Sequence, residues 1–76
     1  MRPRAVEVKP LKNYILKITF DNGETKEFDV KPYMNHKVFE ELKNIAMFNT
    51  VKLSGLSIAW ANGADICPDE LYLNSI

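Results

Sequence analysis

The chain has 76 residues, of which 46% are hydrophobic and 26% charged, and its formal net charge is zero. These values are typical of one small globular domain, which we expect to span residues 1–76. No apolar run approaches the length of a membrane-spanning helix, and no apolar segment of a signal peptide follows the first residues. A single cysteine, Cys67, excludes an internal disulfide framework and fits a reducing compartment, so we expect a cytoplasmic protein.

Charge is unevenly distributed along the chain. Residues 57–76 hold three acidic side chains and no Lys or Arg. Residues 1–17 are basic, with Glu7 as the one acid against Arg2, Arg4, Lys9, Lys12 and Lys17. Nucleic-acid-binding modules usually combine a clear basic excess with interleaved aromatic residues for stacking, and this chain has neither. Nucleic-acid binding through the basic N-terminal strand therefore stays as a second hypothesis.

The first half of the chain predicts three strands. Arg4–Pro10 alternates in polarity and places Val6 and Val8 on one side. Tyr14–Phe20 is rich in β-branched and aromatic residues, and Glu24–Val30 returns antiparallel to it.

An Asn-Gly pair between the second and third of these strands predicts a hairpin turn. A two-residue loop would place Lys17 opposite Phe28. A three-residue loop ending at Gly23 instead pairs Leu16 with Phe28 and gathers the apolar side chains on one face. We therefore expect Gly23 to adopt the left-handed conformation that closes such a loop.

A helix is expected after this hairpin. Asn35 is the expected N-cap, since its side chain can accept a hydrogen bond from the first turn. Val38, Leu42 and Ile45 then recur at helical spacing, and the helix is expected to end within residues 44–48.

The second half repeats the pattern of the first. Three strands are expected at Thr50–Leu53, Leu56–Trp60 and Ala64–Ile66. The Asn-Gly pair ending at Gly63 predicts the same three-residue loop, which pairs Ile58 with Ile66. Pro68 suits the first position of a short helix, and the acidic residues after it suit the positive end of the helix dipole.

The resulting order, β-β-β-α-β-β-β-α, is typical of an α+β domain. We expect it to consist of an antiparallel sheet with helices on one face, with two similar Asn-Gly hairpins. Strand parity and helix period then predict which side chains form the core. The expected core comprises Leu16, Ile18, Phe20, Phe28, Phe39, Leu42, Ile45, Ile58, Trp60 and Leu71.

No set of residues in the sequence forms an active-site motif, so we predict no catalytic, cofactor-binding or metal-binding residues and no enzymatic activity. His36, the one histidine, has no second histidine or clustered cysteine beside it and is interpreted as a surface residue. Cys67 is interpreted as a small apolar filler rather than a nucleophile. The neighbouring acids Asp65, Asp69 and Glu70 supply too few oxygen ligands for a hard cation.

Trp60 and Tyr72 can be interpreted in two ways, as a binding platform or as core residues. Because Trp60 shares its strand face with Ile58, the core is the preferred position for it.

The order of these residues resembles the family catalogued as domain of unknown function 2442. The resemblance spans nearly the whole chain, and its most specific part is Trp60-Ala61-Asn62-Gly63-Ala64-Asp65 with Pro68, Leu71 and Tyr72. The family often has proline directly after the tryptophan, where this chain has Ala61. The resemblance implies a small β-rich α+β protein from bacteria. It also implies a neighbouring small gene, an arrangement similar to toxin–antitoxin pairs, and it supplies no catalytic residue.

Two hypotheses on function follow. The first is a non-enzymatic protein-interaction module that binds a partner chain or a second copy, such as the neutralising half of a small bacterial operon pair. The second is a regulatory domain that binds a small molecule or nucleic acid. For the first, we expect contact through a sheet edge or through the face opposite the helices. The residues expected on that face are Ile15, Lys17, Thr19, Glu27, Ala59 and Asp65.

Overall fold

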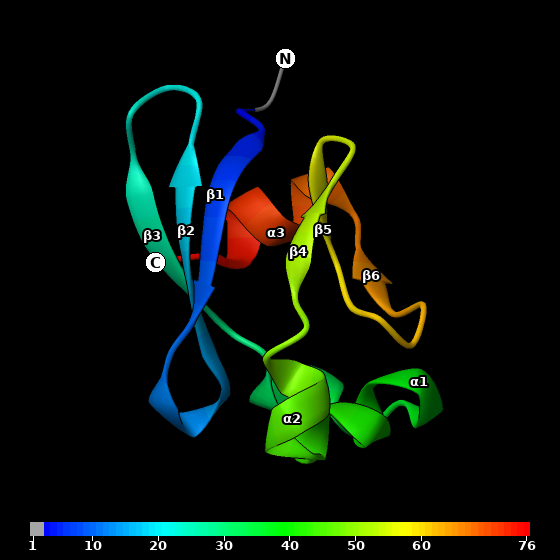
Figure 1. The fold of residues 1–76 in the computed structure, drawn as a ribbon. Helices are drawn as coiled ribbons and strands as arrows, with labels where there is room; N and C mark the ends of the chain where they lie inside the picture. Colours follow the sequence, from blue (N-terminus) through cyan, green and yellow to red (C-terminus); the bar gives the residue numbers. More distant parts are fainter. Residues whose placement is uncertain (1–2) are drawn as a thin grey trace.

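The structure, a computed structural model, describes residues 3–76; Arg2 of the basic segment lies outside them. Six strands form two antiparallel sheets, ordered β1-β2-β3 and β4-β5-β6 (Figure 1). The strands are β1 (Ala5–Pro10), β2 (Ile15–Phe20), β3 (Thr25–Asp29), β4 (Lys52–Ser54), β5 (Ser57–Ala59) and β6 (Asp65–Ile66). The expected α+β class and element order are confirmed, but the strands form two sheets where one was expected.

Short helical segments connect and close the sheets. They are the 3-10 turns η1 (Lys12–Tyr14), η2 (Lys31–Tyr33) and η3 (Glu41–Lys43), and the helices α1 (Lys37–Glu40), α2 (Ile45–Phe48) and α3 (Pro68–Asn74). Pro68 is the first residue of α3, as expected, and Cys67 is its N-cap.

The prediction of a single helix from Asn35 onward is wrong, because the segment breaks at Asn44. Asn44 has a ψ of 118°, outside the helical range, and its side-chain oxygen accepts the amides of Ala46 at 2.9 Å and Met47 at 3.4 Å. An asparagine that caps a new helix in this way competes with continuation of the old one. At the other end, His36 rather than Asn35 occupies the N-cap of α1, and its side chain makes no capping hydrogen bond.

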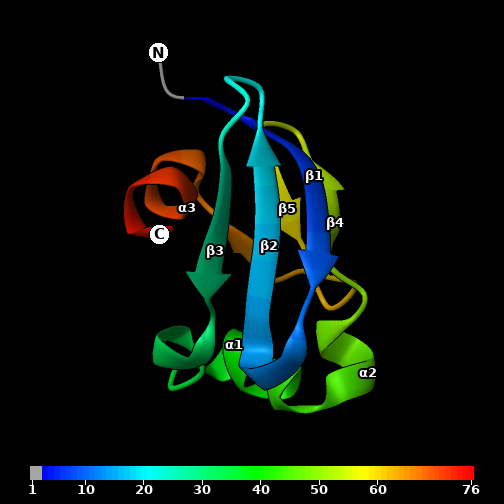
Figure 2. The same cartoon turned by 90° about the vertical axis from the view of Figure 1, so that its left-hand side faces the viewer.

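The two sheets approach each other along their edge strands β1 and β4 and diverge on the opposite side (Figures 1 and 2). Helix α3 lies between the sheets on that diverging side, and α1 and α2 close the lower end. Each sheet has one apolar face, which must be covered by another element. The two sheets face each other, and helices close the gaps between them, so the apolar faces of both sheets are covered at once.

The first hairpin has the predicted register, with Leu16 opposite Phe28. The amide of Phe20 donates to the carbonyl of Glu24 at 2.8 Å, and the amide of Gly23 donates to the carbonyl of Phe20 at 3.0 Å. Gly23 has a φ of +88°, as expected. The side-chain oxygen of Asn22 accepts the amide two residues later at 3.0 Å.

The second hairpin repeats this geometry. Ile58 lies opposite Ile66, and Gly63 has a φ of +92°. The amide of Trp60 donates to the carbonyl of Ala64 at 2.8 Å. The side-chain oxygen of Asn62 accepts the amide of Ala64 at 3.0 Å, as Asn22 does in the first turn. The two turns are therefore equivalent in backbone geometry and in the hydrogen bond that the asparagine oxygen accepts, whereas the asparagine nitrogens have different partners.

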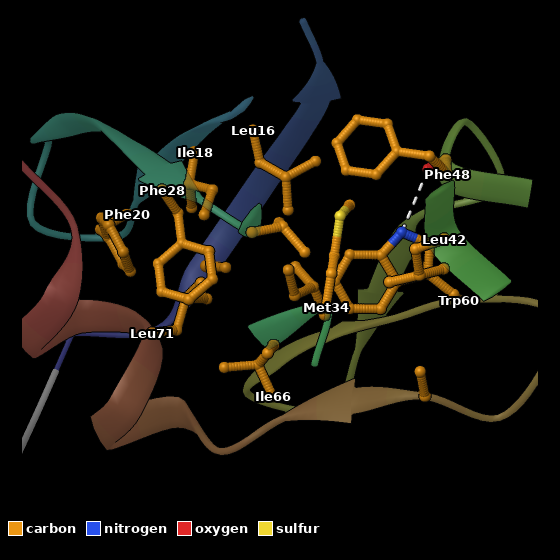
Figure 3. Packing of buried hydrophobic residues seen from close by; sticks show 14 residues of the cluster. Leu16, Ile18, Phe20, Phe28, Met34, Leu42, Phe48, Trp60, Ile66 and Leu71 are labelled. Carbon is orange, nitrogen blue, oxygen red and sulfur yellow. Dashed lines mark hydrogen bonds between the residues drawn. The ribbon is translucent and has the colours of Figure 1, made fainter. Parts of the chain in front are cut away.

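One core joins the two sheets and the helices (Figure 3). Eight of the ten predicted core residues are buried. Phe39 is half-buried, and Ile45 is 54% exposed because the break at Asn44 turns it out of the apolar stripe. Phe48 and Met34 fill the space beside Leu42 instead. The buried hydrophobic residues that the prediction missed are Ala5, Val30, Met34, Phe48, Ala64 and Ile66.

Trp60 links sheet and helices inside this core. Its side chain is 2% exposed, and Nε1 donates to the carbonyl of Phe48 in α2 at 3.1 Å (Figure 3). Its ring lies 6.0 Å from that of Phe39 and 6.5 Å from that of Phe48. Trp60 is therefore a core residue.

Tyr72 connects α3 to the first hairpin. Its ring meets the edge of Phe20 at 5.0 Å, and its hydroxyl donates to the carboxylate of Glu24 at 2.5 Å. This hydrogen bond, followed by the one from Asn22, lowers the pKa of Glu24. The rim of the hairpin is thus fixed to the last helix.

Strand β1 contains a bulge that changes its predicted faces. The register shifts between Ala5 and Glu7, so Ala5 is buried and Val6 is 44% exposed. Val8, opposite Ile18, keeps the inward side. The expectation that Val6 and Val8 share a face is wrong because the extra residue reverses the alternation.

Replacing either turn glycine by alanine is expected to destabilise the fold by about 1 kcal/mol or more, because the left-handed conformation is unfavourable for alanine. An added Cβ at Gly23 or Gly63 would meet no atom within 4 Å, so the loss comes from the backbone alone. Urea denaturation measures it. Asparagine at the same positions is the control and should cost less, because it tolerates this conformation better. Equal losses for both replacements would contradict the explanation.

Replacing Trp60 by alanine is expected to cost about 3–5 kcal/mol. Trp60→Phe keeps most of the volume but leaves the Phe48 carbonyl without its donor, which should cost about 1–3 kcal/mol. Urea denaturation followed by circular dichroism ranks the two variants. A stable Trp60→Ala protein that loses only partner binding would show that Trp60 belongs to a binding site.

Candidate functional site

The line along which β1 and β4 approach each other, called here the seam, is the first candidate surface. The strands belong to different sheets, and the backbone hydrogen bond beside them runs from the amide of Ala5 to the carbonyl of Leu56 at 3.4 Å. Three apolar side chains along the seam, Val6, Leu53 and Leu56, are exposed. Exposed apolar residues that gather along one line are typical of contact surfaces.

A hollow of about 650 Å³ lies between the η1 turn and α2. We call it the α2 hollow; its lining consists of Pro10, Leu11, Lys12, Asn13, Ile45, Phe48 and Asn49. Leu11 and Ile45 are exposed, whereas Phe48 belongs to the core. The same break at Asn44 that removes Ile45 from the core therefore supplies an apolar wall to the hollow.

The backbone beside the α2 hollow is strained. Asn13 and Tyr14 have φ values of 61° and 60°, which non-glycine residues rarely adopt, least of all an aromatic one. The Tyr14 hydroxyl donates to the carbonyl of Lys43 at 2.5 Å, and Lys31 Nζ donates to the carbonyl of Asn13 at 2.6 Å. Strained backbone held in this way occurs preferentially at functional sites. This left-handed backbone was not predicted. Its one sign in the sequence is Asn13, a residue type that adopts positive φ more readily than most.

The outer edge of β3 is partly covered. The amide of Glu27 donates to the carbonyl of Ile76 at 2.7 Å, and the amide of Ile76 donates back at 2.9 Å. The end of the described chain thus adds a single bridge to this edge.

The outer face of the first sheet is polar. Lys9, Lys17 and Glu27 lie side by side across its three strands and are all exposed. Ile15 and Thr19 are half-buried. Of the face residues in the other sheet, Ala59 is half-buried and Asp65 is exposed. The expected contact face therefore carries charge rather than an apolar patch.

A second hollow, of about 330 Å³, brings together residues that the sequence analysis considered separately. We call it the acidic hollow; its lining consists of Tyr33, His36, Phe39, Asp65, Ile66, Cys67 and Glu70. His36 is exposed, in line with its interpretation as a surface residue. Cys67 is also exposed, so its interpretation as a filler is wrong: as N-cap of α3 it lies outside the core.

Tyr33 and Glu70 are coupled within the acidic hollow. The Tyr33 hydroxyl donates to Glu70 Oε2 at 2.7 Å. Burial first, and then this hydrogen bond to a carboxylate, raise the pKa of Tyr33 to about 12. Within residues 3–76, no group of three or more His, Cys, Asp and Glu side chains is arranged to hold a metal ion.

The fold and these surfaces define a small α+β domain built from two three-stranded antiparallel sheets, each with an Asn-Gly hairpin turn. The chain belongs to the family described as protein of unknown function, DUF2442, whose model matches residues 5–76. No curated protein and no solved structure matches it. No helix among the described residues has the length and apolar character needed to span a membrane.

Tyr33 is expected to lose its proton only near pH 12 when tyrosinate absorbance is followed with pH. Its folded-state pKa of about 12 exceeds the usual 10, so the folded state holds this proton more tightly than the unfolded state. Its contribution to stability is fully present below pH 10 and is lost as the pH rises from 10 to about 12. Tyr33→Phe should remove the absorbance change near pH 12, and an unaltered change in that variant would contradict the coupling.

Proposed function

We propose that this protein is a non-enzymatic protein-interaction module that acts in the cytoplasm as the neutralising half of a small bacterial operon pair. The observation that carries the proposal is the α2 hollow with its exposed apolar residues Leu11 and Ile45, and the exposed apolar side chains of the seam add to it. A protein partner is the kind of ligand that such a surface fits, because burial of apolar area drives association.

The seam and the hollow each offer apolar contacts to a partner chain. Val6, Leu53 and Leu56 supply apolar area along the seam, and Leu11 and Ile45 border a concave site into which a partner side chain can insert. Interfaces gain most of their binding energy from a few such buried anchors.

Charge and strain add to this support. Lys12 is the one charged residue in the described part of the chain that lines the α2 hollow, so it favours a partner with an acidic group beside its apolar anchor. The strained pair Asn13 and Tyr14 holds the rim in a fixed shape before binding. A pre-formed rim lowers the entropic cost of association.

Nucleic-acid binding through the basic first strand is the second hypothesis. Its specific support is the direct pairing of Lys9 with Lys17 across β1 and β2, which places two positive charges side by side. The exposed acids Glu7 and Glu27 flank this pair and reduce its attraction for phosphate.

Ile45→Gln is expected to weaken the affinity for the neighbouring gene product by roughly fivefold to a hundredfold, since loss of a buried apolar anchor costs on the order of 1–3 kcal/mol at an interface. Glutamine adds no charge and is a good helix former. Leu73→Gln on α3 is the matched control, because Leu73 is 59% exposed and lies outside the lining of the hollow. Co-expression with the neighbouring gene, followed by pull-down and light scattering, measures the effect.

Three outcomes contradict the proposal. The first is equal binding by both variants, and the second is a strict monomer that ignores the neighbouring gene product. The third, a salt-dependent shift of DNA by the isolated chain, would favour the nucleic-acid hypothesis.

A further inference from the structure

The acidic hollow combines aromatic rings with carboxylates on a surface distinct from the seam. One side comes from the segment after β3, which supplies Tyr33 and Phe39. The other side comes from β6 and α3, which supply Asp65 and Glu70.

The rings of the hollow are held in place by the core beneath them. Tyr33 stacks on Phe28 with ring centroids 5.3 Å apart and lies 6.0 Å from Phe39. Phe39 in turn meets Trp60 edge-on at 6.0 Å. Phe28 and Trp60 are buried, so the two outer rings rest on a fixed base. Rigid aromatic faces of this kind attract cations at little entropic cost.

The two carboxylates differ in their surroundings. Glu70 is positioned by the Tyr33 hydroxyl and by the side-chain amide of Asn74, each 2.7 Å from Oε2. Asp65 makes no hydrogen bond or ion pair through its side chain with any residue in the described part of the chain. Among residues 3–76, no Lys or Arg lines the hollow, and Lys37, which follows His36, is not part of the lining.

We propose that the acidic hollow binds an arginine side chain of a protein partner. The guanidinium stacks over the Tyr33 and Phe39 rings and pairs with the free carboxylate of Asp65. The plane and the fork of hydrogen-bond donors in arginine suit this combination better than the point charge of lysine. That the arginine belongs to a protein rests on the proposed function, whereas recognition of the guanidinium rests on the hollow alone.

The test uses the folded chain and N-acetyl-arginine amide as the probe, with amide chemical shifts as the readout. We expect saturable shifts confined to the lining residues, such as Phe39, Ile66 and Cys67. N-acetyl-citrulline amide, which has nearly the same shape without the charge, should produce none. Asp65→Asn should raise the dissociation constant roughly twofold to fivefold, as expected for an exposed ion pair.

Glu7→Gln on β1 is the control variant, because it removes one exposed acid outside the hollow and should leave binding unchanged. The proposal would be overturned by shifts that spread over the whole surface or by equal binding of the citrulline probe. Equal binding of N-acetyl-lysine amide would overturn it as well. An unaltered dissociation constant in Asp65→Asn would also overturn it. Ile45→Gln, which alters the α2 hollow, should leave this titration intact, so failure here is distinguishable from failure of the proposed function.

Discussion

The fold depends on one constraint: neither three-stranded sheet can cover its own apolar face. Trp60 helps most directly to cover these faces, since its ring extends from the second sheet toward the helices and its Nε1 donates a hydrogen bond to the Phe48 carbonyl. From the other sheet, Leu16 and Phe28 complete the same core, and Leu71 of α3 fills the side where the sheets diverge. A domain of this size buries only about 60–65% of its unfolded surface, so each of these contacts supports a large share of a small total.

The candidate surfaces are consequences of the same arrangement. Because the sheets converge at β1 and β4, two edge strands with exposed apolar side chains come together there. Because the central helical segment breaks at Asn44, Ile45 points outward and borders the α2 hollow. The acidic hollow lies where the end of the first half of the chain meets the second hairpin, so its aromatic and acidic residues come from opposite halves.

Local rules were sufficient for much of the fold. The face parity of Leu16 and Phe28 determined the hairpin register, and the same argument at Ile58 determined the second. The failures have two kinds of cause. The cap at Asn44 is local, and the prediction of one continuous helix passed over it although asparagine is a preferred N-cap. The bulge after Ala5 and the division into two sheets depend on tertiary contacts that no residue spacing encodes. Neither hollow could be predicted, because their linings join segments far apart in the sequence, as Tyr33 and Glu70 show.

The central claim is that both sheets form one cooperative unit around a shared core. Hydrogen exchange of the Ile18 and Ile58 amides tests it most directly, because these buried residues hold matching positions in the two hairpins. Measured at increasing urea below the unfolding transition, both amides should approach the same free energy of opening, equal to that of global unfolding. If Ile58 opened at a lower free energy than Ile18, with its own smaller but non-zero dependence on urea, the second sheet would unfold by itself and the account would be contradicted.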